Sequence, residues 1–491
     1  MVRLSPVLSP TPMRPVAFFI LLATNMTASA QPVVSAPETR ESTSLTVYNG
    51  GFAVVREVRT IPLRRGLMSV RFEGVPARID PTSLSLASLS SPGSVSVREQ
   101  NYQYNLVSTQ SVLDAAVGQR IRLVRQIGET TVVDEGVLIS QPGQGRIVRL
   151  DDGRVLVDPA GTIELTTLPD GLLSRPSLLW QLDSAVDGPQ RLEARYLTDG
   201  ITWEADYVAV VNDDETALDL TGWVTLDNQS GTSYRQAALQ LIAGDVRRVQ
   251  PPRPPMMARG EVAMYDAVAV QAAPTEEAFF EYHLYTFPNP TDIAERETKQ
   301  MELLSAQAVG TSRRLIIDAT GQYFPFYRPA RPGETGEERS AAVVMTVANT
   351  DANRMGMPLP AGTVRVYKVD ARGALQFLGE DRIEHTPRGE TLRLYVGDAF
   401  DVVGTRREVS SRQISNRERE VTVEIEVRNR KQTAAEVDVV ERAFYGDWRI
   451  VSATVDGREA QPERLDARTA QWSLSLGADE TATVRYTARI R

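Results

Sequence analysis

The 491-residue sequence carries a net charge of −9, from 63 acidic and 54 basic residues, and it contains two histidines and no cysteine. The missing cysteines exclude disulfides, thiol nucleophiles and thiolate metal sites. Acidic residues outnumber basic ones, and the two kinds are mixed along the chain. We therefore expect no nucleic-acid partner and little attraction to anionic membrane surfaces.

The first 30 residues have the three-part pattern of a secretory signal peptide. Arg3 and Arg14 are basic, a short apolar core follows, and Ala28-Ser29-Ala30 supplies the small residues that precede a cleavage site. The apolar core is too short to span a bilayer. Whether translation starts at the first methionine or at Met13 stays open. We predict export to the periplasm or cell envelope, with no transmembrane helix after removal of the leader.

Beyond this leader, apolar and polar residues alternate along many short stretches. Val421, Val423, Ile425 and Val427, for example, are separated by Thr, Glu and Glu. Successive side chains of a strand point to opposite faces, so this pattern predicts strands with one buried face. Few stretches show the apolar spacing of a helix, and residues 111–117 are the main candidate for one. The sequence predicts a mainly β fold of several antiparallel β-sandwich or small-barrel modules with few short helices.

Composition and turn residues divide the chain into consecutive parts. The segment at 250–277 is rich in proline, methionine and alanine, and proline cannot donate to a sheet ladder. The expected parts are a signal peptide (1–30), a linker (31–43), an N-terminal β module (44–106), a short helix with a small barrel-like β module (107–168), β-sandwich strands (169–249), a linker or loop (250–277), a β-sandwich (278–405) and a C-terminal β-sandwich module (406–491).

Nine stretches share a pattern with one bacterial family. They are residues 100–106 (QNYQYNL), 176–180 (PSLLW), 196–207 (YLTDGITWEADY), 220–225 (LTGWVT), 243–246 (AGDV), 359–367 (LPAGTVRVY), 377–381 (FLGED), 385–387 (HTP) and 396–401 (VGDAFD). Together they resemble domain-of-unknown-function family 4139, some relatives of which carry the label mucoidy-inhibitor-like. The resemblance spans nearly all of the chain after the leader, and it implies an exported, β-rich protein of a family without an established activity.

Glu380, Asp381 and His385 form one candidate site, since two carboxylates and an imidazole can bind a divalent cation. In a strand, however, Glu380 and Asp381 point to opposite faces. The alternative interpretation is structural: the residues around Asp381 shape a bend, and those after His385 form a turn.

Glu204 and Asp206 form the second candidate site. Two residues apart on a strand, they share a face and stand near the separation that glycoside hydrolysis requires of its two carboxyl groups. Trp203 lies beside them in sequence, and aromatic rings stack on sugars. The alternative is that Trp203 and its neighbours mark ordinary packing.

Two functions are compatible with these observations. The first is a non-catalytic cell-envelope protein that binds or scaffolds an envelope protein or polysaccharide through its loops and strand edges. The second is a carboxylate-dependent enzyme acting on surface polysaccharide. The first is preferred because no nucleophile motif is present, histidine is scarce and the predicted layout is a series of strand-rich modules. No cofactor is expected.

Overall fold

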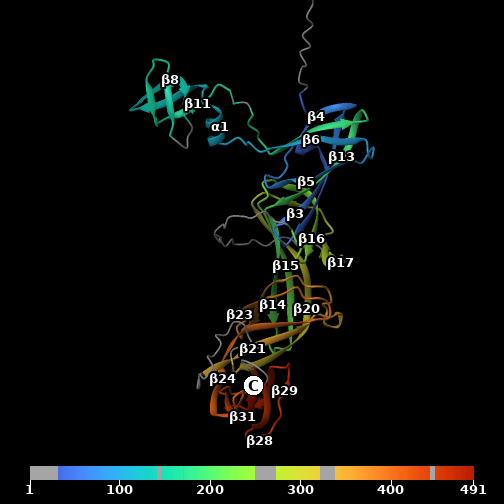
Figure 1. Ribbon diagram of the computed structural model, residues 1–491, viewed down its shortest axis with the longest axis vertical. Helices are drawn as coiled ribbons and strands as arrows, with labels where there is room; N and C mark the ends of the chain where they lie inside the picture. The colour runs from blue at the N-terminus through green and yellow to red at the C-terminus, as the bar shows by residue number, and fades with distance from the viewer. Residues whose placement is uncertain are drawn as a thin grey trace, which may run out of the picture.

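The computed structural model describes residues 31–140, 145–167, 169, 171–248, 273–320, 338–442 and 448–490. The predicted signal peptide, residues 1–30, and residues 250–272 of the predicted linker lie outside this part of the chain. The fold is mainly β, as predicted, with four sheets, three of which follow one another along the long axis of the molecule (Figure 1). Within the described part of the chain, no helix has the length and apolarity that crossing a membrane requires.

Two sheets form the N-terminal end. The first has the strand order β1 (Val33–Ser35), β4 (Gly66–Glu73), β12 (Ser177–Ser184) and β6 (Val95–Gln103). The second has the order β17 (Thr275–Phe279), β18 (Tyr282–Thr286), β16 (Tyr234–Ala243), β2 (Arg40–Tyr48), β3 (Phe52–Leu63), β13 (Gly188–Asp199) and β5 (Ile79–Ser88), and β19 (Thr291–Ile293) pairs with β16. Strands therefore occupy parts of both predicted linkers: β1 and the start of β2 lie within 31–43, and β17 begins before 277.

A small module is inserted between β6 and β12. It contains the helix α1 (Thr109–Ala115) and a five-stranded sheet in the order β10 (Val155–Val157), β9 (Ile147–Leu150), β8 (Thr130–Leu138), β7 (Arg120–Ile127) and β11 (Thr162–Glu164). The sheet is open, because β10 and β11 are edges that do not pair with each other. The module has its own small core and projects sideways from the molecule (Figure 1).

The largest sheet holds fourteen strands. Its main path is β23 (Leu375–Ile383), β22 (Gly362–Val369), β14 (Ile201–Val211), β15 (Ala217–Asn228), β20 (Glu297–Asp318), β21 (Glu338–Ala348), β24 (Thr391–Ser415), β25 (Glu418–Asn429), β31 (Thr481–Ile490), β27 (Trp448–Val455) and β28 (Arg458–Glu459). The strands β26 (Ala435–Arg442), β29 (Glu463–Arg464) and β30 (Thr469–Leu476) join it off this path, and two 3₁₀ turns occupy Pro37–Thr39 and Asp351–Asn353.

Two main hydrophobic cores lie along this arrangement. The first core joins the N-terminal sheets to the first strands of the fourteen-stranded sheet, and the second core fills the C-terminal end. The long strands β20 and β24 contribute to both: Leu394 packs in the first core and Val402 in the second. The boundary expected at residue 405 therefore falls inside β24, because one continuous strand serves both cores.

The predicted alternation is confirmed in the second core. Val421, Val423, Ile425 and Val427 of β25 are all buried, with at most 4% of each residue exposed. The Asp456-Gly457 pair, a typical hairpin-turn dipeptide, joins β27 to β28, and both residues have the positive φ angles of a tight hairpin, 49° and 76°.

A buried asparagine closes the turn after β15 and another closes the turn after β25. Asn228 Nδ2 donates to the carbonyl of Thr232 at 2.9 Å, and Asn429 Nδ2 donates to that of Thr433 at 2.9 Å. In each turn, the Oδ1 atom accepts the backbone N–H two residues further on. Both residues are fully buried. The two cores thus use the same local device to turn the chain from one strand to the next.

Candidate functional site

Glu204 and Asp206 lie on the outward face of β14, as their spacing predicts. Glu204 is exposed, whereas Asp206 accepts a hydrogen bond from the Thr225 hydroxyl at 2.8 Å and lies 3.2 Å from Arg365 Nη1. These partners hold the Asp206 carboxylate on the surface of the sheet.

The aromatic residue beside this pair is different from the expected one. Trp203 faces the core, is 1% exposed and packs edge-on against Tyr285, with the ring centroids 6.4 Å apart. Trp223 pairs with Asp206 across β14 and β15 and therefore shares its outward face. The aromatic ring on the same face as the two carboxylates is therefore that of Trp223, which belongs to the neighbouring strand β15.

Glu380, Asp381 and His385 do not converge. Glu380 pairs with Arg365 at 3.4 Å, and His385 Nδ1 accepts the backbone N–H of Ala361 at 3.1 Å. Among the residues that the structure describes, no three or more His, Asp or Glu side chains are grouped so that they could hold a metal ion. Each of the three predicted ligands has its own structural partner.

Asp381 helps to hold a curled sheet together. The fourteen-stranded sheet bends so that β23 comes close to β24, and Asp381 Oδ2 accepts the backbone N–H of Tyr395 at 2.7 Å. A Cβ atom at Gly379 would lie 1.8 Å from the Val396 carbonyl oxygen, so the close approach requires glycine there. The Gly379-Glu380-Asp381 stretch is therefore part of the fold's architecture, in line with the structural interpretation.

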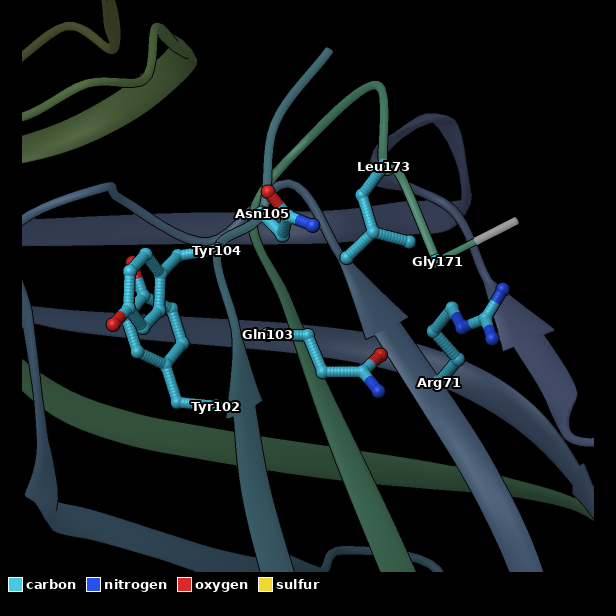
Figure 2. Close-up of a pocket in the computed structure, with 7 residues that line it drawn as sticks. All are labelled: Arg71, Tyr102, Gln103, Tyr104, Asn105, Gly171 and Leu173. Atoms are coloured by element: carbon cyan, nitrogen blue, oxygen red, sulfur yellow. The ribbon is translucent and has the colours of Figure 1, made fainter. Parts of the chain in front are cut away.

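A pocket of about 490 Å³ opens beside the N-terminal sheet, where the inserted module joins it. Arg71 of β4, Gln103 at the end of β6, and Leu173 on the segment that returns from the module surround it (Figure 2). Gln103 points toward the Arg71 side of the pocket in this view. An isolated bridge between Leu106 and Leu173 ties the two connecting segments together, and this positions Leu173 over the pocket.

Two polar atoms of this pocket have unmet hydrogen-bonding capacity. Arg71 Nε and Gln103 Oε1 are both buried, and neither has a hydrogen-bond partner among the described residues. An unpaired buried donor or acceptor costs about 1–3 kcal/mol. A donor and an acceptor that line the same pocket therefore favour a ligand that offers both a hydrogen-bond acceptor and a donor.

Two tyrosines stand beside the pocket. The rings of Tyr102 and Tyr104 stack with their centroids 5.4 Å apart, and 69% of Tyr104 is exposed (Figure 2). The Tyr102 hydroxyl donates to the Ala77 carbonyl at 2.9 Å. Burial raises the pKa of Tyr102, and the nearby Tyr104 adds a smaller effect in the same direction. Tyr102 is thus a fixed, neutral support that holds the exposed ring of Tyr104 in place.

The sequence pointed to part of this pocket without indicating its chemistry. The stretch 100–106 resembles a family pattern, and the alternation of Val70, Arg71 and Phe72 predicts that Arg71 lies on an outward face. Neither signal places Arg71 near Gln103, because their strands are joined only through β12, which follows the inserted module.

Comparison with protein families gives one match. The family model for a domain of unknown function, DUF4139, covers residues 192–491. This chain belongs to the DUF4139 family. A comparison with curated proteins finds no match. The DUF4139 region contains both predicted carboxylate sites, whereas the described lining residues of the pocket around Arg71 all precede it.

Proposed function

We propose that this DUF4139 protein is exported to the cell envelope and binds an envelope polysaccharide there without catalysing a reaction on it. The observation that carries this proposal is the pair of unpaired buried atoms, Arg71 Nε and Gln103 Oε1, in one pocket. A sugar hydroxyl accepts and donates hydrogen bonds at the same atom, so neighbouring sugar hydroxyls can satisfy both protein groups.

The aromatic pair supports the same type of ligand. The exposed ring of Tyr104, stiffened by its stack on Tyr102, offers an apolar face with a polar tip. The apolar side chain of Leu173 completes a pocket with mixed polar and apolar lining. Such a combination is typical of sites that hold a ligand through a few placed polar groups.

The described lining residues favour binding over catalysis. They are Arg71, Tyr102, Gln103, Tyr104, Asn105, Gly171 and Leu173, and none of them is an acid, a histidine or a serine. General acid–base and nucleophilic catalysis draw mainly on those residue types. The envelope location is supported by the leader pattern in residues 1–30.

The binding test uses the protein lacking residues 1–30 and polysaccharides extracted from the envelope of its host, with calorimetry as the readout. We expect Gln103→Leu and Tyr104→Ala to weaken binding at least tenfold, because they remove an acceptor and the exposed ring. Arg65→Gln is the matched control, since this arginine is 73% exposed and lies outside the pocket.

Two results would contradict the proposal. One is that no envelope polysaccharide binds, or that the pocket variants bind as well as the unmodified protein. The other is turnover of the polysaccharide that is lost in Glu204→Gln or Asp206→Asn, which would support the enzyme alternative. Export is tested separately by fractionation and mass spectrometry, with a mature N-terminus at Gln31 expected.

A further inference from the structure

A second, larger cleft of about 760 Å³ lies where the N-terminal strands meet the DUF4139 region. Arg40 and Thr43 of β2 line it on one side, and the loop at 231–233 and Arg235 of β16 line it on the other. The described linings of this cleft and of the pocket around Arg71 share no residue. The cleft is therefore distinct from the proposed polysaccharide site.

A buried group of charges lies at the floor of this cleft. We call it the Glu57 cluster, and it consists of Glu57, Arg59, Arg40 and Tyr196. Arg59 Nη2 donates to Glu57 Oε2 at 2.6 Å, and the Tyr196 hydroxyl donates to Oε1 at 2.7 Å. Arg40 Nε lies 3.0 Å from the same Oε2 atom but outside hydrogen-bonding geometry. Because two guanidinium groups share one carboxylate, the cluster carries a net positive charge.

The surplus positive charge is located on Arg40. Arg59 is fully buried, and its Nη1 donates to the carbonyls of Ser35 and Glu73 at 2.9 Å each, while its guanidinium stacks on the ring of Phe72. Arg40, by contrast, has one further long contact, 3.5 Å from its Nη2 to a backbone carbonyl, and it lines the cleft.

The carboxylates in the cleft wall are engaged elsewhere. Their partners are Arg175 for Glu38 at 2.7 Å, Arg191 for Glu41 at 2.7 Å, and the backbone N–H of Gly231 for Glu295 at 2.8 Å. Each of these acids thus has a partner other than Arg40.

The same cleft contains a buried hydroxyl group. Thr43 is 3% exposed, lines the cleft, and its Oγ1 atom has no hydrogen-bond partner among the described residues. It pairs with Glu57 across β2 and β3, so it lies directly above the cluster. A hydroxyl and a guanidinium that line one cleft are donors that suit an acceptor carrying negative charge.

We propose that this cleft binds an oxyanion, the carboxylate or phosphate group of a ligand, through Arg40 and Thr43 at its floor and Arg235 at its side. The bound group supplies the second negative charge that the Glu57 cluster lacks and accepts the Thr43 hydrogen. Since the cleft lies between the N-terminal strands and the DUF4139 region, a ligand held there contacts both parts of the chain.

The test measures binding of inorganic phosphate and, separately, of acetate to the mature protein by calorimetry and thermal unfolding, at constant ionic strength balanced with chloride. We expect at least one of the two anions to bind and to raise the melting temperature above the chloride control. Thr43→Val, which keeps the side-chain shape, and Arg235→Gln should each weaken that binding at least tenfold. The anion that binds more tightly identifies the ligand group.

Arg65→Gln serves as the control and should bind the anion as the unmodified protein does, because this arginine is 73% exposed and lies outside the cleft. The inference is overturned if neither anion binds more tightly than chloride, or if Thr43→Val and Arg235→Gln both bind it unchanged. Because the polysaccharide test changes residues of the other pocket and uses other ligands, the failure of one proposal leaves the other standing.

Discussion

The two ends of the molecule each contain a buried Glu–Arg–Tyr group with a Tyr–Glu hydrogen bond of the same length, but the two groups differ in net charge. In the C-terminal core, Tyr486 donates to Glu441 Oε1 at 2.7 Å and Arg406 Nη2 donates to the same oxygen at 2.8 Å. We call these three residues the Glu441 cluster. The Tyr–Glu distance equals that of the Glu57 cluster, but no second arginine is recorded near Glu441 among the described residues.

The difference appears in the ionisation of the two arginines. Burial lowers the pKa of Arg59. The neighbouring Arg40 lowers it further, whereas Glu57 acts in the opposite direction and raises it. Burial also opposes the charge on Arg406, but Glu441 and Tyr486 outweigh it and raise the pKa of that guanidinium. A carboxylate of its own therefore stabilises Arg406, whereas Arg59 shares its carboxylate with Arg40.

The comparison shows how one buried motif can serve two purposes. The neutral Glu441 cluster is complete and acts as a structural tie within a core. The Glu57 cluster carries one unbalanced positive charge, and it lies beside a cleft in which a ligand can supply the missing negative charge. A buried ion pair is thus weak evidence for function until its charges are counted.

Removing the central carboxylates is expected to have the largest effect. Glu57→Gln and Glu441→Gln should each lower the free energy of unfolding by about 3–5 kcal/mol, because each leaves a buried guanidinium without its counter-charge. The loss should be larger for Glu57→Gln, since two arginines lose the same partner. Urea unfolding at neutral pH measures both values.

The control for these carboxylates is Glu38→Gln, whose side chain is 67% exposed and which should unfold nearly as the unmodified protein does. An equal or smaller loss at Glu57 than at Glu441 would contradict the charge count. Phosphate or acetate should not restore stability to Glu441→Gln.

The two asparagine turns provide a comparison in which equal effects are expected. Asn228→Ala and Asn429→Ala should each lower the free energy of unfolding by about 2–3 kcal/mol, because each substitution leaves buried backbone groups unsatisfied. Asn289→Ala, at an exposed position between β18 and β19, is the control. Strongly unequal losses in urea unfolding would show that the shared hydrogen bonds do not make the two turns equivalent.

The smallest expected effect is on the unfolding free energy at alkaline pH, where the two buried tyrosines titrate. Burial, with the adjacent glutamates, holds the pKa values of Tyr196 and Tyr486 well above 10 in the folded protein. Because the folded-state pKa exceeds the unfolded value of about 10, each hydroxyl contributes its full stability below that pH and loses it as pH rises further.

Tyr196→Phe and Tyr486→Phe should therefore each flatten the fall of unfolding free energy above about pH 10, by up to 1.4 kcal/mol per pH unit. Near pH 7 each variant should lose about 1 kcal/mol from the missing hydrogen bond. Urea unfolding at several pH values measures both effects. An unchanged alkaline slope would contradict the buried, neutral state of these two side chains.

Local chemistry was sufficient to predict much of the fold. The period-two alternation in β25 predicts a strand with one buried face wherever that strand pairs, and the Asp456-Gly457 pair predicts a tight turn from its own conformational preference. The same pleat already places Trp203 and Glu204 on opposite faces once the stretch is a strand. That Trp223 lies opposite Asp206 depends on the register between two strands, which the local pattern does not specify.

The sequence by itself determined the alternating strands, the tight turns and, by its match to DUF4139, the family. Only the tertiary structure decided which distant residues meet, such as Arg71 with Gln103 at one pocket and Arg40 with Glu57 beneath the cleft. The physical reason is that strand character depends on neighbours along the chain, whereas pairing and burial depend on the whole fold. The charges that remain unmatched in the interior therefore become visible only after every strand has its partner.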